Sequence, residues 1–488
     1  MTTAPLSRTT AHTDLPVVVV GAGPIGLAAA AHLTDRALPV VVLESGADVG
    51  AAVSEWAHIR TFTPWEFIVD PTAERLLATA GWTRPTAPAP PTGAELVEQY
   101  LRPLGALVGG ALRLGHRVLA VTREGMDKTR TVGRSERPFV VRVQRPDGEV
   151  EEIRARAVVD ASGTWSGRNP LGGSGLPAIG EEAAAAFVTG PLPDVLGRDR
   201  ERFAGRRTVV VGAGHSAANT LLNLSRLAAQ EPGTEVLWAI RGSSPARVYG
   251  GGAADELAAR GRLGSDLRAM VEEGHVELIT DFTVTALEQD GDAVTLVGAS
   301  AADGGVRRLA GVHTVVAATG FRPDLGILSE VQLDMDAALE APARLAPLID
   351  PQFHSCGTVP PHGHRDLAQP DEGLYVVGMK SYGRAPTFLI TTGNEQERSV
   401  VAAIAGDLEA ADRVQLVLPE TGVCSVDAAG VDQGGAGCCG SAAAAPSDPH
   451  HRERPAGVPA QGFVTGLAAS GTPVLTLASP RPTTPCCP

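Results

Sequence analysis

The sequence has little cysteine, few aromatic side chains and no long apolar run. Cysteine accounts for 6 of 488 residues, and Phe, Trp and Tyr together for 4%. Six cysteines in a chain of this length do not form a disulfide framework, so we expect reduced thiols. No apolar stretch reaches the roughly 20 residues that span a bilayer, and the polar N-terminus lacks the apolar core of a signal peptide. We therefore expect a cytoplasmic protein with no membrane partner.

Positive charge is also scarce. The chain carries 41 Lys and Arg against 55 Asp and Glu, a formal net charge of −14. Nucleic-acid backbones and anionic lipids require clustered positive charge, so neither is an expected partner. The length allows two or three domains with a core large enough to enclose a small molecule. A small-molecule substrate is the expected partner, and these features do not determine the oligomeric state.

The apolar pattern predicts two βαβ units. Residues 17–20 are four valines, which is typical of a strand buried on both faces of a parallel sheet. A glycine-rich turn, an Ala-rich helix over 25–33 and a second strand over 40–43 follow. The same order of strand, turn, helix and strand recurs over 208–240. This internal repeat predicts an α/β protein built from two similar units.

The first unit contains the fingerprint Gly-x-Gly-x-x-Gly between its strand and its helix. In this motif Gly21 permits the tight turn, Gly23 lets the backbone approach a pyrophosphate, and Gly26 lets the helix pack closely on the strand. The helix N-terminus then directs unpaired N–H groups at the phosphates. Glu44 ends the next strand, where a carboxylate binds ribose hydroxyls and repels a 2′-phosphate. The first-site candidates are Gly21, Gly23, Pro24, Ile25, Gly26, Glu44 and Ser45.

The second unit repeats the fingerprint with Ala217 in place of the third glycine. The decisive difference lies at the end of its second strand, where Arg241 stands in the position that Glu44 holds in the first unit. An arginine there suits the 2′-phosphate of NADPH, or else it is a solvated surface residue. The contrast favours FAD in the first site and NADPH in the second. The second-site candidates are Gly212, Gly214, His215, Ser216, Ala217 and Arg241.

Three further segments carry a resemblance to a known family. They are 160–165 (DASGTW), 318–323 (ATGFRP) and 373–378 (GLYVVG). Together with the two fingerprints, they resemble the two-dinucleotide-binding flavoproteins, and within these the flavin-containing monooxygenase-like group. The resemblance covers about residues 15–415 and implies two Rossmann-like α/β domains.

The resemblance also implies a discontinuous domain layout. Residues 1–165 and 321–418 are expected to form the FAD domain, with the NADPH domain, residues 166–320, inserted between them. The remaining residues, 419–488, are rich in Gly, Ala, Ser and Pro and have few large apolar side chains. Such a composition does not offset the entropy lost on ordering, so we expect a disordered tail.

Further cofactor contacts follow from the resemblance, whereas no residue is identified as a catalytic acid, a catalytic base or a metal ligand. In this family the segment after the last glycine lies beside the flavin. The next helix, expected to begin near Thr391, directs its N-terminus toward negative charge on the ring. Arg60, in the helical insertion of the first domain, is a candidate phosphate or flavin contact. The additional candidates are Arg60, Val118, Ser162, Gly163, Thr319, Gly320, Gly378, Met379 and Thr391.

Departures from the family leave the electron acceptor open. Members usually carry an acid where this chain has Met379, and monooxygenases carry a histidine signature in the stretch that matches 172–207, which contains no histidine here. No Cys-x-x-Cys pair is present for thioredoxin reductase chemistry. The main hypothesis is a flavin monooxygenase that passes electrons to oxygen and substrate. The alternatives are a reductase of a quinone, metalloid or protein, and a non-enzymatic redox or metalloid-binding protein.

Adjacent thiols in the tail are the basis of the metalloid alternatives. The pairs Cys438-Cys439 and Cys486-Cys487 are soft ligands for thiophilic metals. A flavoprotein chain with such a tail resembles the flavoproteins encoded in bacterial arsenic-resistance clusters. A tail without function is the other interpretation. The loop 354–364 holds three histidines and one cysteine. It is either a substrate-proximal or soft-metal cluster or, since its spacing matches no zinc template, an ordinary polar loop.

Overall fold

The computed structural model describes residues 12, 14–250, 252, 255, 257–300, 304–354 and 359–416. All six cysteines and the predicted tail lie outside these residues, and so do the interpretations that depend on them. None of the described helices is long and apolar enough to cross a membrane. The described part of the chain is organised around two parallel sheets, each with its own small antiparallel sheet.

The first parallel sheet has five strands: β1 (Val17–Val20), β2 (Val40–Leu43), β3 (Leu112–Arg113), β7 (Ala157–Asp160) and β16 (Leu374–Val376). Their spatial order is β16-β7-β1-β2-β3. All four valines of β1 are buried, because both faces of the sheet are covered. The register pairs Val20 with Leu43 and with Asp160, so the carboxyl ends of β1, β2 and β7 meet at one edge.

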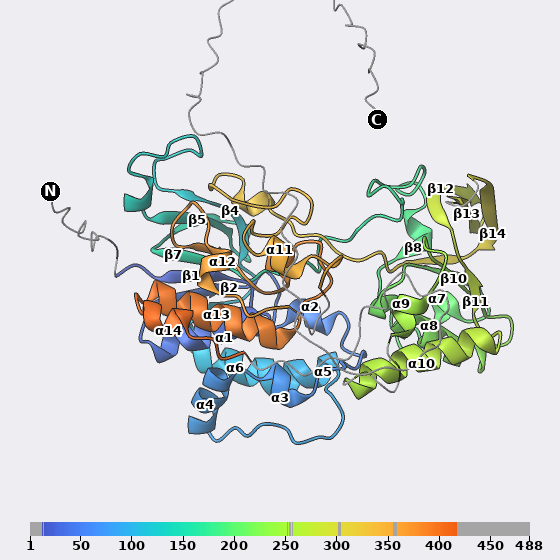
Figure 1. Cartoon of the computed structure of the whole chain (residues 1–488), viewed down its shortest axis with the longest axis horizontal. Helices are drawn as coiled ribbons and strands as arrows, with labels where there is room; N and C mark the ends of the chain where they lie inside the picture. Colours follow the sequence, from blue (N-terminus) through green and yellow to red (C-terminus); the bar gives the residue numbers. More distant parts are fainter. Residues whose placement is uncertain are drawn as a thin grey trace, which may run out of the picture. The chain divides into compact units, whose positions relative to one another are not determined.

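A layer of helices and an antiparallel sheet cover opposite faces of the first sheet (Figure 1). Val17 and Val19 pack with the helices, whereas Val18 and Val20 pack with the antiparallel strands, as the alternation of side chains along a strand requires. The antiparallel strands are β4 (Arg117–Arg123), β5 (Phe139–Gln144) and β6 (Val150–Ala155). The helices of this region are α1 (Pro24–Asp35), α2 (Ala51–Ser54), α3 (Trp65–Ile68), α4 (Pro71–Thr79), α5 (Gly93–Leu96), α6 (Arg102–Val108), α11 (Ala346–Ile349), α12 (His364–Leu367), α13 (Ile390–Ile404) and α14 (Leu408–Asp412).

Helix α1 is enclosed on all sides. The residues from Ile25 to Leu33 are all buried, because α1 contacts the sheet on one side and α4, α6 and α13 on the others. A helix that is apolar around its whole circumference is typical of such a position. His32 is the polar exception within this stretch.

The second parallel sheet repeats the arrangement. Its strands are β8 (Val188–Thr189), β9 (Arg207–Val211), β10 (Glu235–Ala239), β11 (Glu277–Ile279) and β15 (Thr314–Ala317), in the order β11-β10-β9-β15-β8. The strands β12 (Thr283–Asp290), β13 (Ala293–Ala299) and β14 (Val306–Val312) form the antiparallel sheet. The helices are α7 (Arg200–Phe203), α8 (His215–Ala228), α9 (Ala246–Tyr249) and α10 (Ala258–Glu272). Val210 packs with the helices and Val209 with the antiparallel strands, so the layering is the same.

The strand order confirms that one α/β unit interrupts the other. The first sheet is completed by β16, which pairs with β7, although every strand of the second sheet lies between them in sequence. In the second sheet the corresponding edge strand, β8, comes before the others in the chain. The predicted fold class, two Rossmann-like units of which one is inserted into the other, is confirmed. The domain boundaries at 165/166 and 320/321 remain a prediction.

Candidate functional site

The first fingerprint forms the turn between β1 and α1. Gly21 has φ +97°, and a Cβ there would lie 2.8 Å from the carbonyl oxygen of Ala161. A Cβ on Gly26 would lie 2.0 Å from the carbonyl oxygen of Gly21, so only glycine allows α1 to approach this closely. A Cβ on Gly23 would meet nothing within 4 Å. The turn is therefore open at the one position where the motif brings a pyrophosphate against the backbone.

Glu44 lies at the edge of this turn. One carboxylate oxygen accepts a hydrogen bond from the Ala22 N–H at 2.7 Å, and the other accepts one from the Gly46 N–H at 2.7 Å. The Ser45 hydroxyl donates to the same carboxylate at 3.4 Å. Hydrogen bonds from backbone N–H groups to an ionised acceptor hold the acceptor firmly. Glu44 thus ties the glycine-rich turn to the end of β2, in addition to any contact with a ribose.

Ile25 joins the first fingerprint to two segments from the far end of the chain. A Cβ on Gly378, which has φ +66°, would lie 3.1 Å from Ile25 Cγ1. A Cβ on Gly393 in the first turn of α13 would lie 2.5 Å from Ile25 Cδ1. The predicted helix near Thr391 is thus present as α13, in which Thr391 is the second residue. The structure brings the first fingerprint, the end of β16 and the start of α13 together.

A buried ion pair connects the carboxyl ends of β7 and β16. The Lys380 ammonium lies 2.6 Å from an Asp160 carboxylate oxygen and 3.0 Å from the Ser162 hydroxyl. Asp160 also accepts a hydrogen bond from the Ser162 hydroxyl at 2.6 Å. Lys380 is 1% exposed and Asp160 is fully buried. Lys380 lies in the segment after Gly378 that the resemblance places beside the flavin, but sequence reasoning did not identify its partner, which is 220 residues away.

The second fingerprint forms the turn between β9 and α8 with the same design. Gly212 has φ +132°, and a Cβ there would lie 2.1 Å from the carbonyl oxygen of Ala318. A Cβ on Gly214 would meet nothing within 4 Å, so this turn too is open where a phosphate would approach. His215 and Ser216 begin α8, and Ala217 is fully buried. Both turns therefore fit a dinucleotide pyrophosphate.

Arg241 follows β10, the strand next to β9, as Glu44 follows β2 next to β1. Its side chain is exposed and donates a hydrogen bond to the Gly173 carbonyl at 3.2 Å.

The segment with Thr319 and Gly320 is held by Asn169. The Asn169 side chain donates to the Thr319 carbonyl at 3.1 Å, and the Asn169 backbone N–H donates to the Gly320 carbonyl at 3.0 Å. Asn169 is a residue that sequence reasoning missed.

The remaining predicted contacts lie at separate places. Arg60 donates to the Pro90 carbonyl and lies 3.3 Å from a Glu95 carboxylate oxygen, where it is about half exposed. Val118 is buried in β4, and Met379 lies partly buried in the short helix η7 (Gly378–Tyr382). Gly163 has φ +70° just after β7. The roles of these residues in cofactor binding remain predictions.

The histidines of the 354–364 loop do not converge. The His362 Nδ1–H donates to the Pro360 carbonyl at 3.0 Å, and its Nε2 accepts from the Gln396 amide at 2.9 Å. Burial lowers the pKa of His362, in keeping with this neutral tautomer. His364 instead contacts Asp412 at 2.9 Å. These separate partners favour the polar-loop interpretation for the described residues of the segment.

Gln396 is a second residue that sequence reasoning missed. Its side-chain oxygen accepts a hydrogen bond from the Gly378 N–H at 2.7 Å, and its amide donates to the Ser381 hydroxyl at 2.9 Å and to His362. Gln396 is fully buried. This buried network holds the chain at the end of β16, and it could not be found from sequence because its members come from three separate segments.

Residues 18–344 match the family described as pyridine nucleotide-disulphide oxidoreductase. An indole-3-pyruvate monooxygenase of Oryza sativa subsp. japonica is 31% identical over 215 residues, which is 43% of this chain and 45% of that protein. The chain thus matches about half the length of this relative.

Similarity to solved structures extends over most of the chain. A bacillithiol disulfide reductase from Bacillus cereus has a TM-score of 0.60 at 19% identity and covers 80% of this chain and 99% of its own. An ornithine N-hydroxylase of Kutzneria sp. 744, with reduced FAD, NADP⁺ and L-ornithine, has a TM-score of 0.53 at 18% identity and covers 81% and 99%. At these identities the similarity shows the fold.

Proposed function

The chain belongs to the pyridine nucleotide-disulphide oxidoreductase family, and we propose that it is an oxidoreductase with FAD at the first fingerprint and NADPH at the second. The observation that carries this assignment is the contrast between two similar turns. Glu44 places a buried carboxylate at the end of β2, whereas Arg241 places an exposed guanidinium at the end of β10. A carboxylate repels a 2′-phosphate and a guanidinium binds one.

The protein's own contribution is to bind and orient. Gly23 and Gly214 leave the backbone open to a pyrophosphate, and neither α1 nor α8 has a side-chain cap on its N-terminal N–H groups. The Lys380–Asp160 pair and the Gln396 network hold the strand ends beside the first fingerprint. A bound flavin would supply the redox chemistry, that is, the capacity to accept hydride from NADPH and to pass electrons to an acceptor. No side chain is assigned as an acid or base.

For the electron acceptor we propose oxygen together with a small organic substrate, as in a flavin monooxygenase. The 31% identical relative is a monooxygenase, and the sequence contains no Cys-x-x-Cys pair that would serve disulfide reduction. A reductase with another acceptor is the second candidate, because residues 172–207 lack the histidine expected of monooxygenases.

Aspartate substitutions in the two open turns test the cofactor assignment. Gly23 and Gly214 have φ of −78° and −113°, which other residues adopt, and an added Cβ meets nothing within 4 Å. Each substitution should therefore leave the fold intact while its charge excludes a pyrophosphate. We expect Gly23→Asp to purify without bound FAD. Gly214→Asp should retain FAD, seen by its visible spectrum, but lose reduction by NADPH. Loss of FAD from Gly214→Asp alone would reverse the assignment.

Oxygen use distinguishes the two acceptors. NADPH oxidation by the purified wild-type protein is followed in air and under anaerobic conditions with added quinone. A monooxygenase should consume oxygen in step with NADPH and release little hydrogen peroxide once its substrate is present. Rapid anaerobic turnover with quinone, together with slow oxygen consumption, would favour the reductase.

A further inference from the structure

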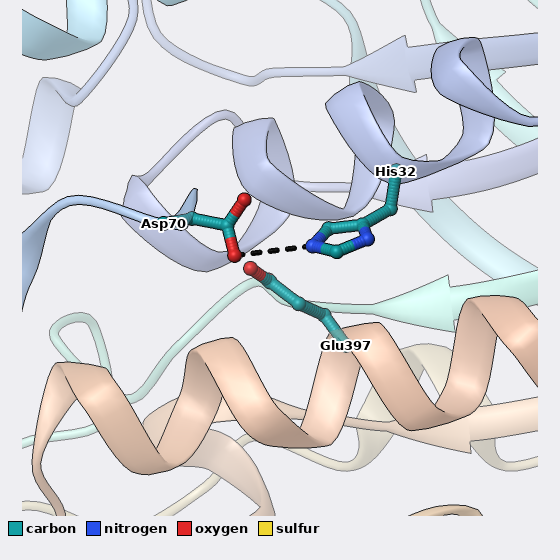
Figure 2. Close-up of side chains that lie close together, drawn as sticks. All are labelled: His32, Asp70 and Glu397. Carbon is teal, nitrogen blue, oxygen red and sulfur yellow. Dashed lines mark hydrogen bonds and ion pairs between the residues drawn. The ribbon is translucent and has the colours of Figure 1, made fainter. Parts of the chain in front are cut away.

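A cluster of ionisable side chains lies away from both fingerprint turns. His32 comes from α1, Asp70 from the residue that caps α4, and Glu397 from the middle of α13, and they point toward one another (Figure 2). His32 Nε2 lies 3.1 Å from an Asp70 carboxylate oxygen. One nitrogen and two carboxylate oxygens of the cluster lie within 4.8 Å of one another. The three residues are 6%, 2% and 0% exposed.

Asp70 is held in place by groups other than His32. Its Oδ1 accepts a hydrogen bond from the Ala73 N–H at 2.7 Å, and its own N–H donates to the Tyr100 hydroxyl at 3.1 Å. These contacts fix the carboxylate and leave Oδ2 directed at His32 and Glu397 (Figure 2). The orientation of this carboxylate is therefore set by the backbone around it.

Glu397 is the unexplained member of the cluster. Neither of its carboxylate oxygens makes a hydrogen bond of ordinary geometry with the described residues. In the described part of the chain, no lysine or arginine forms an ion pair with Glu397 or Asp70. Burial raises the pKa of Glu397 and the neighbouring charge of Asp70 raises it further, which outweighs the lowering of the pKa by the backbone of Ala29. A fully buried carboxylate normally has a hydrogen-bonding partner, a counter-charge or a metal ion.

We propose that His32, Asp70 and Glu397 bind one divalent first-row transition-metal ion, such as Mn²⁺, Fe²⁺ or Zn²⁺. Two carboxylates and a neutral imidazole carry a charge of −2, which such an ion balances. An imidazole nitrogen among the ligands favours a transition metal over Mg²⁺ or Ca²⁺, which prefer oxygen. The three ligand atoms lie close enough together for a modest rotation of the Glu397 side chain to bring all of them within about 2.0–2.2 Å of one ion.

The position of the cluster indicates a structural ion. The ligands come from α1, from α13 and from the residue that caps α4. Both α4 and α13 pack on α1, and the low exposure of the three side chains gives a substrate no access. An ion there would link α1, which begins at the first fingerprint, to α13, whose first turn packs on Ile25 of that fingerprint. This inference does not depend on the identity of the cofactor or the electron acceptor.

Metal content and thermal stability test the proposal on the full chain. The protein is stripped with a chelator, dialysed against Mn²⁺ and analysed by mass spectrometry for metal and by electron paramagnetic resonance for bound Mn²⁺. Mn²⁺ is the main probe because cysteine thiolates in general select Zn²⁺ and Cu⁺ and not Mn²⁺. We expect about one bound Mn²⁺ per chain and a melting temperature raised by about 3 °C or more at saturating metal.

Variants make the result specific to this cluster. Glu397→Gln keeps the side-chain shape and should lose the bound Mn²⁺ and the rise in melting temperature. Glu66→Gln, at an exposed acid of α3, should keep both. If Glu397→Gln does not fold, His32→Gln replaces it. Equal Mn²⁺ content in wild type and Glu397→Gln would overturn the proposal. So would a wild-type protein without bound Mn²⁺, which would mean that Glu397 is protonated and donates a hydrogen bond to Asp70.

Discussion

The two fingerprint turns share their first two glycines and differ at the third small residue. In the first turn a Cβ on Gly26 would collide with the Gly21 carbonyl oxygen at 2.0 Å, whereas Ala217 carries a Cβ at the equivalent position of the second turn and is fully buried. The second turn therefore has room for a Cβ at a position where the first turn has none. The comparison teaches that the third glycine is required only where helix and strand approach this closely.

The strand ends beside the two turns also differ. In the first region the ends of β7 and β16 are joined by the buried Lys380–Asp160 ion pair. In the second region the corresponding end of β15 is followed by Thr319, which is held by neutral hydrogen bonds to Asn169. A buried charge without its partner is far more unfavourable than a lost neutral hydrogen bond. The first region should therefore be the more sensitive to substitution.

The largest expected difference comes from removing one member of the buried pair. Lys380→Met leaves Asp160 charged and buried, so the free energy of unfolding should fall by about 3–5 kcal/mol, as measured by urea denaturation. Asn169→Ala in the second region should lower it by about 1 kcal/mol. Arg384→Met is the matched control, since the partly exposed Arg384–Glu340 pair contributes at most about 1 kcal/mol. Equal effects for Lys380→Met and Arg384→Met would refute the contrast.

Exchanging glycine and alanine at the third small position of the two fingerprints should have the next largest effect on the free energy of unfolding. Gly26→Ala forces α1 away from the Gly21 carbonyl, and overpacking of this kind lowers the free energy of unfolding by about 1–3 kcal/mol. The variant should also bind less FAD. The reverse change, Ala217→Gly, should cost about 0.5–1 kcal/mol through backbone entropy and spare cofactor binding. Thermal denaturation and the flavin spectrum measure both, and a harmless Gly26→Ala would contradict the close approach of α1.

Arg241 should distinguish the two nicotinamide cofactors. Arg241→Ala removes a charged contact to the 2′-phosphate, so the KM for NADPH should rise about tenfold while that for NADH changes little. Steady-state kinetics with both cofactors measure this. Arg226→Ala, at an exposed arginine on α8, serves as the control. If both cofactors respond equally to Arg241→Ala, the assignment of the second site to NADPH loses its support.

The smallest expected effect is a change in how the free energy of unfolding falls at low pH, caused by one buried carboxylate, Asp371. Burial alone would raise the pKa of Asp371, but hydrogen bonds from Arg134, Gln332 and Arg123 outweigh it and lower the pKa below its usual value. A lowered native pKa stabilises the fold above the unfolded value near 4 and loses this contribution as the pH falls through the native pKa.

Denaturation between pH 6 and pH 2 measures this contribution. Wild type should lose stability over this range more steeply than Asp371→Asn, which has no carboxylate to protonate. Asp147→Asn, at an exposed acid between β5 and β6, serves as the control. Parallel pH profiles for wild type and Asp371→Asn would show that the ion-paired carboxylate does not contribute to the pH dependence of the free energy of unfolding.

Short-range pattern was enough to predict much of the fold. The strand predicted at 17–20 is β1, the helix predicted over 25–33 lies within α1, and the strand predicted at 40–43 is β2. These features depend on residues that are adjacent in sequence, such as the run of valines and the spacing of glycines. The inserted topology came instead from the resemblance of separate segments, because strand order cannot be derived from local periodicity.

The sequence alone was sufficient to identify the two fingerprints and the contrast between Glu44 and Arg241. A strand, a tight turn and a helix N-terminus are all encoded within about thirty residues. Only the tertiary structure revealed the Lys380–Asp160 pair and the His32–Asp70–Glu397 cluster. Their members meet because separate helices and strands pack in one particular register. That register is decided by the fit of buried side chains throughout the core, which no local stretch of the chain contains.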